Sequence, residues 1–143
     1  MIHGVRATTV IFKDLQSVTP TLGAQLAGRF AGIHGVGHQV RLGEQSFRVW
    51  AGNPQSKGKA IACSLQLGPI DNIELPKVEG ELRFEPGPSG GRTKVTIEGS
   101  CARTASGLPP SVGRDQVLRI ANEHCRLLLG ILASAIEDIA QGH

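Results

Sequence analysis

Two stretches in the last part of the chain decide the fold: GELRFEPGPSGGRTKVTIEGSCAR at residues 80–103 and RIANEHCRLLLGILASAIEDIA at residues 119–140. In the first, Leu82 and Phe84 alternate with charged residues, and a similar alternation resumes after a loop rich in glycine and proline. This pattern indicates two half-buried antiparallel strands joined by a solvated hairpin loop. We therefore predict strands over Glu79–Glu85 and Thr93–Arg103.

The second stretch belongs to a run from about Ser111 to Gln141 that contains no proline. Its apolar positions follow helical spacing in two adjacent sets, so the apolar arc is too wide for a helix that merely rests on a surface. We predict one long terminal helix that is covered on more than one side. The first set is Val117, Ile120, Ala121, His124, Leu128, Ile131, Ala135 and Ile139, and the second is Leu118, Cys125, Leu129, Leu132 and Ile136.

The first part of the chain predicts a strand followed by a helix. Val5–Phe12 is rich in β-branched residues, which favours a strand. Ser17 or Thr19 can then cap a helix that places Leu22, Leu26 and Phe30 on one face and ends near Gly32, as expected for a residue that terminates helices.

The middle of the chain predicts three further strands. HQVRLG at 38–43 and EQSFRVWAG at 44–52 look like a hairpin with a tight turn at Gly43-Glu44. Lys59–Leu67 alternates as a half-buried strand, and Gly68–Lys77 is mainly a connection with an optional edge segment. No repeat or interdomain linker interrupts the pattern, so residues 1–143 are predicted to form a single α+β domain.

Composition narrows the classes of function. The chain has 143 residues, 40% of them hydrophobic and 19% charged, with a formal charge of +3. Its arginines are scattered and its aromatic residues few, so the footprint of a nucleic-acid-binding protein is missing. The longest apolar stretch, Leu127–Ile136, is too short to span a bilayer, and the N-terminus does not resemble a signal peptide. We expect a cytoplasmic protein without stable membrane insertion.

Neither the cysteines nor the paired histidines predict a metal site. Cys63, Cys101 and Cys125 are odd in number, lack CxxC spacing and fall in apolar patterns, which indicates buried reduced thiols. His34 and His38 are four apart, but the glycines between them disfavour a helix and no third ligand is evident. We therefore expect no metal and no cofactor.

The order strand, helix, five antiparallel strands and long helix resembles the helix-grip fold of the START-like (SRPBCC) superfamily. That superfamily includes polyketide cyclases, lipid-transfer domains and plant hormone receptors. The resemblance covers nearly the whole chain and depends on the two quoted stretches, although only six strands are clear where seven are typical. It implies a curved sheet of six to seven strands around the terminal helix, and a hydrophobic or amphipathic ligand such as a lipid or polyketide in an internal cavity.

A cavity between the sheet and the terminal helix is also expected on physical grounds. A strongly curved sheet against one helix leaves space between them when its inward side chains are small, and few bulky rings are available here. A solid core made of the same residues is the alternative. The predicted ligand-binding residues are Val40, Phe47, Val49, Ile61, Cys63, Leu65, Leu82, Phe84, Val95, Ile97, His124 and Leu128.

His124 is the candidate for chemistry, because a neutral imidazole among apolar neighbours offers one donor and one acceptor. Glu123 and Asn122 point elsewhere around the helix, so neither is expected to pair with it. No serine or cysteine has the neighbours that nucleophilic catalysis needs. Trp50 and Arg103 are candidates for the rim of a pocket.

Three functions remain open on the sequence alone. The first is binding of a hydrophobic small molecule, the second is a cyclase-like or lyase-like reaction that uses His124, and the third is a protein-interaction module with a filled core. The sequence leaves open whether the chain is an enzyme and whether it forms a homodimer.

Overall fold

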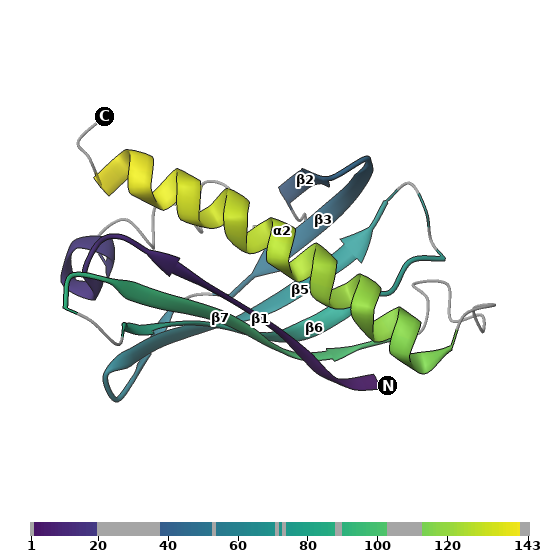
Figure 1. Cartoon of the computed structure of the whole chain (residues 1–143), viewed down its shortest axis with the longest axis horizontal. Coiled ribbons are helices and arrows are strands. Elements are labelled where there is room, and N and C mark those ends of the chain that lie inside the picture. The colour runs from purple at the N-terminus through teal and green to yellow at the C-terminus, as the bar shows by residue number, and fades with distance from the viewer. Residues whose placement is uncertain are drawn as a thin grey trace.

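One antiparallel sheet with a long helix lying across it makes up the described part of the chain (Figure 1). The computed structural model describes residues 2–19, 38–52, 54–70, 72, 74–87, 90–102 and 113–140, with backbone only for 38 and 138–140. The predicted α+β class, antiparallel sheet and terminal helix are confirmed. The elements are β1 (Ile2–Ile11), β2 (His38–Leu42), β3 (Gln45–Ala51), β4 (Gln55–Lys57), β5 (Ala60–Pro69), β6 (Val78–Pro86), β7 (Thr93–Cys101) and α2 (Arg114–Ala140).

The sheet has the order β1-β7-β6-β5-β3-β2, and β4 pairs with β5 beside this path. β3 and β4 pair with different parts of β5, so together they act as one strand that is interrupted around Gly52 and Pro54. The short β4 was not predicted, because all three of its residues are exposed and carry no apolar alternation. The predicted turn at Gly43-Glu44 is confirmed, with Gly43 at a φ of 64°.

Two glycines face each other on the neighbouring strands β6 and β7. Gly80 of β6 pairs with Gly99 of β7, and Gly99 in turn pairs with Val5 of β1, next to a β-bulge. A Cβ atom on Gly80 would lie 2.3 Å from the backbone oxygen of Glu98, which no ordinary side chain tolerates. Glycine is therefore required here, because the neighbouring strand backbone leaves no space for a side chain.

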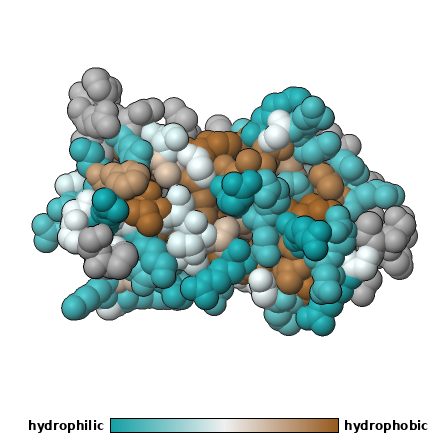
Figure 2. All heavy atoms as spheres, viewed as in Figure 1, coloured by the Kyte–Doolittle hydropathy of each residue, from teal (hydrophilic) through white to brown (hydrophobic). Residues whose placement is uncertain are grey.

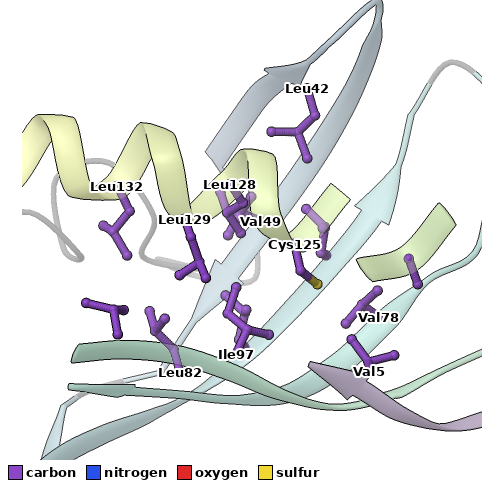
Figure 3. Close-up of a cluster of buried hydrophobic side chains, with 14 of the residues drawn as sticks. Val5, Leu42, Val49, Val78, Leu82, Ile97, Cys125, Leu128, Leu129 and Leu132 are labelled. Atoms are coloured by element: carbon purple, nitrogen blue, oxygen red, sulfur yellow. The ribbon is translucent and has the colours of Figure 1, made fainter. Parts of the chain in front are cut away.

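The helix α2 packs mainly on β1, less on β7 and only slightly on β2. Asp115 lies in its first turn, where a negative charge favours the helix dipole. One continuous core joins α2 to all strands except β4, and Figure 3 shows side chains of α2 such as Cys125 and Leu129 facing Ile97 and Leu82 of the sheet. Within the described residues, no helix is both long and apolar enough to cross a bilayer.

Several predicted boundaries differ from the structure by one or a few residues, and two of these differences have a visible cause. β1 begins at Ile2 rather than Val5, since the bulge with Gly4 at a φ of 105° lets pairing with β7 continue. The helix that follows begins at Leu15, and Asp14 caps it by accepting a hydrogen bond from the Ser17 N–H at 2.8 Å, so Ser17 and Thr19 are not the cap. Residues 20–37, including the rest of that predicted helix, lie outside the described residues.

Candidate functional site

The inward face of the sheet and the facing side of α2 bring the predicted ligand-binding residues together. The strands supply them by simple alternation, because every second side chain of β3, β5, β6 and β7 points to the helix. The buried ones belong to a single core cluster, and Val40 and Ile61 are half-buried against it. The buried members are Phe47, Val49, Cys63, Leu65, Leu82, Phe84, Val95, Ile97 and Leu128.

His124 is the polar member of this group and is 9% exposed. Its ring lies against the ring of Phe47 on β3, with 4.5 Å between the centroids and 57° between the planes. Its Nδ1 atom is buried and has no hydrogen-bond partner. Most buried polar atoms in proteins have a partner, so this exception calls for a physical explanation.

Burial also fixes the charge of His124. Loss of hydration lowers the pKa of the imidazole below its ordinary value, and the Glu123 carboxylate opposes this shift only partly. The ring is therefore neutral at pH 7 and offers one N–H donor and one acceptor nitrogen. A hydrogen-bonding partner for Nδ1 could be supplied by a bound molecule.

The neighbouring polar residues on α2 are engaged elsewhere, as the helical spacing predicted. Glu123 is exposed and accepts hydrogen bonds from the Arg126 guanidinium. The Asn122 side-chain oxygen accepts a hydrogen bond from the Arg6 N–H at 2.9 Å. Neither residue provides His124 with the acid or base partner that general acid–base catalysis by a pair would need.

The other buried polar side chains of the described residues are not orphaned in this interior. The Thr93 hydroxyl donates to the Lys13 carbonyl at 2.8 Å. Thr96 lies within 3.5 Å of the Thr8 hydroxyl. Arg48 also has a buried nitrogen without a partner, but it alternates with Phe47 and Val49 and so lies on the other face of β3. Among the described polar groups between the sheet and the helix, His124 is thus the one with a buried atom that lacks a hydrogen-bond partner.

The core also reaches the surface on its side towards β2. Val40 of β2 and Leu127 and Ile131 of α2 are only partly buried against the cluster. Figure 2 shows apolar atoms at the surface in the region between α2 and the β2–β3 hairpin. Because α2 has little contact with β2, this edge of the interior can open with less loss of packing than the β1 edge.

Two surface hollows lie away from His124. One, of about 470 Å³, runs between β1 and α2 and is lined by Arg6, Arg119 and Arg126 among others. The other, of about 320 Å³, lies over β4, β5 and β6 and includes Cys63 from the predicted set. Both are open to solvent, and their polar linings differ from the apolar surroundings of His124.

The cysteines of the chain are buried and free, as predicted. Burial raises the pKa of Cys63 to about 11 and that of Cys125 to about 12, so both are unreactive thiols at neutral pH. In the part of the chain that the structure describes, no group of three His, Cys, Asp or Glu side chains is placed to hold a metal ion. His34, the His38 side chain and Arg103 lie outside the described residues.

Trp50 does not border the predicted pocket. It alternates with the inward residues Phe47 and Val49 on β3, and it lies close to Gly68, where an added Cβ atom would be 3.5 Å from the indole ring. The ring therefore covers a bare stretch of β5 on the opposite face of the sheet from His124.

In comparisons with known proteins, the chain matches no family model and no curated sequence at a significant level of similarity.

Proposed function

We propose that this protein binds a small hydrophobic or amphipathic molecule, such as a lipid or polyketide, between α2 and the sheet on the side of the β2–β3 hairpin. The observation that carries the proposal is the buried Nδ1 atom of His124, which has no hydrogen-bond partner. A buried polar atom without a partner costs roughly 1–3 kcal/mol of stability. A ligand that reaches this atom would recover that loss.

The surroundings of His124 suit an apolar ligand. Phe47 and Leu128 are buried beside the helix–sheet interface, and Val40, Leu127 and Ile131 leave apolar surface at its edge. Burial of ligand hydrocarbon stabilises a complex by roughly 25 cal/mol for each Å² removed from water. A ligand inserted at this edge would therefore gain apolar contacts along its length and one polar contact at its end.

The order of the elements further supports the proposal. A strand, a helical segment at residues 15–19, an antiparallel sheet and a terminal helix follow one another as in the START-like helix-grip proteins that the sequence resembles. Ligand binding between sheet and helix is what that resemblance implies. The free cysteines support a reducing compartment, and we propose that the protein acts in the cytoplasm.

Binding can be tested with the neutral fluorescent probe N-phenylnaphthylamine, which brightens in apolar surroundings. The unmodified protein should bind it saturably. Val40→Trp fills the edge between β2 and α2 and should weaken binding by about tenfold, equivalent to ~1.4 kcal/mol. Leu118→Trp is the matched control, because Leu118 is half-buried like Val40 but lies on α2 and lines the groove beside β1.

Equal weakening by both substitutions, or no saturable binding by the unmodified protein, would contradict the proposed site. Native mass spectrometry of protein purified from its host gives an independent measurement. A co-purifying apolar compound that is lost in Val40→Trp is the expected result, and a chain that is always empty counts against a carrier.

A further inference from the structure

Resting on the proposed function, we propose that the ligand is an uncharged amphipath whose polar end is a single hydroxyl group hydrogen-bonded to Nδ1 of His124. Its hydrocarbon part would extend over Phe47 towards the half-buried residues Val40 and Ile131. The proposal names a chemical class, such as long-chain or polycyclic alcohols, and sets it against fatty acids and amines.

The charge of the interior excludes an ionic head group. The buried polar side chains of the described residues are Ser46, Thr93, Thr96 and His124, and none of them is a carboxylate, an ammonium or a guanidinium. A carboxylate or ammonium placed beside His124 would lose its hydration and find no opposite charge. An uncharged head group avoids this cost.

The chemistry of a neutral imidazole favours a hydroxyl over other uncharged groups. Nδ1 is either a donor or an acceptor, depending on which ring nitrogen holds the proton. A hydroxyl can both donate and accept, so it satisfies Nδ1 in either tautomer, whereas a carbonyl or ether oxygen satisfies only one.

The groove between β1 and α2, which is lined by three arginines and by the carboxylates of Asp115 and Glu123, is the competing place for an anionic amphipath. Arg119 and Arg126 lie on the side of α2 that faces away from His124, and Arg6 approaches from β1. Binding of a fatty acid there would depend on these cations and not on His124. The experiment therefore has to separate the two places.

Displacement of N-phenylnaphthylamine by decanol, decanoate and decylammonium at pH 8 tests the inference, with decanol kept below its solubility limit and the two ions below their critical micelle concentrations. Each compound has an unbranched chain of ten carbon atoms, and the three differ in the head group. We expect decanol to displace the probe at concentrations at least about tenfold lower than either ion, a ratio that corresponds to one hydrogen bond plus an avoided desolvation.

Two substitutions at one position make the test specific. His124→Leu keeps an apolar side chain of similar volume and should remove most of the advantage of decanol while the probe still binds. His124→Asn places a polar atom close to the position of Nδ1 and should restore part of that advantage. A purely structural role for His124 would weaken all three compounds alike, and circular dichroism of each variant establishes that it is folded.

Several outcomes would overturn the inference. Decanoate that displaces the probe as well as decanol would do so, and Arg119→Ala would then show whether the β1–α2 groove binds it. A decanol preference that survives in His124→Leu would do so as well. If the probe binds but only ions displace it, the head-group assignment fails alone, and if the probe does not bind at all, the proposed function fails with it.

Discussion

At the scale of single residues, His124 combines a cost to stability with the proposed binding role. Because Nδ1 is buried without a partner, we expect His124→Leu to stabilise the ligand-free protein by about 1 kcal/mol. Urea denaturation at pH 8 measures this difference. A loss of more than about 2 kcal/mol would mean that His124 is an ordinary core residue whose contacts outweigh the unmet hydrogen bond.

The same residue predicts a dependence of stability on pH. Burial lowers the pKa of His124 in the folded protein from its ordinary value of 6.5, so the unfolded chain takes up this proton more readily. Above pH 6.5 the ring is neutral in both the folded and the unfolded chain, so the full free energy of unfolding is present. As pH falls below 6.5 towards the folded pKa, the unfolded chain binds the proton first and part of this free energy is lost. Unfolding free energies of the unmodified protein and His124→Leu, measured between pH 8 and pH 5, should diverge as the medium is acidified. Parallel curves would show that burial does not disfavour the charged ring.

At the scale of elements, β6 and β7 pair in a register that needs glycine at both Gly80 and Gly99. Gly80→Ala would place a Cβ atom 2.3 Å from the Glu98 backbone oxygen, and we expect it to destabilise the fold by about 1–3 kcal/mol. Gly130→Ala is the control, because Gly130 is an exposed helical residue with no atom within 4 Å of the added Cβ. That change should stabilise α2 by about 0.5–1 kcal/mol. Thermal unfolding of both variants measures the contrast, and equal effects would contradict it.

The free edge of β1 is protected by side chains of α2. Asn122 accepts a hydrogen bond from the Arg6 N–H, and Glu137 accepts one from the Phe12 N–H at 3.1 Å. An uncovered edge strand invites pairing with other chains. We expect Asn122→Ala to speed hydrogen exchange at the Arg6 amide by about tenfold or more, while Glu123→Ala, which removes only an exposed ion pair, leaves it unchanged. Unchanged exchange in Asn122→Ala would mean that the helix does not hold this edge.

At the scale of the whole molecule, the sequence predicted what depends on local periodicity. The alternation of Leu82 and Phe84 predicted the hairpin of β6 and β7. The wide apolar arc of α2 predicted that this helix is buried on more than one side. Features that depend on contacts distant in sequence were missed. The opposition of Gly80 and Gly99 requires the register of two strands, and β4 has no buried residue to mark it.

The sequence predicted part of the candidate site, and the rest depends on tertiary contacts. Alternation and helical spacing were enough to place Phe47 and His124 on the inward faces of their elements. They could not show that the two rings meet at 4.5 Å, or that Nδ1 is left without a partner, because both facts follow from how β3 and α2 are oriented in the folded chain. Chemistry specific to His124 therefore emerges only at the tertiary level.

The continuous core predicts that sheet and helix unfold together. Buried residues of β1, β2, β3, β5, β6, β7 and α2 all belong to one cluster, so α2 cannot separate without exposing the inward face of the sheet. Trp50, the single tryptophan, follows the sheet by fluorescence, and far-ultraviolet circular dichroism follows α2. The two signals should give coincident urea transitions. Leu129→Ala, which removes a side chain that is 1% exposed at the centre of α2, should shift both midpoints equally and cost about 2–5 kcal/mol. A dichroism transition at lower urea concentration than the fluorescence transition would mean that α2 unfolds separately from the sheet. The proposed binding site between them would then lack a stable helix on one side.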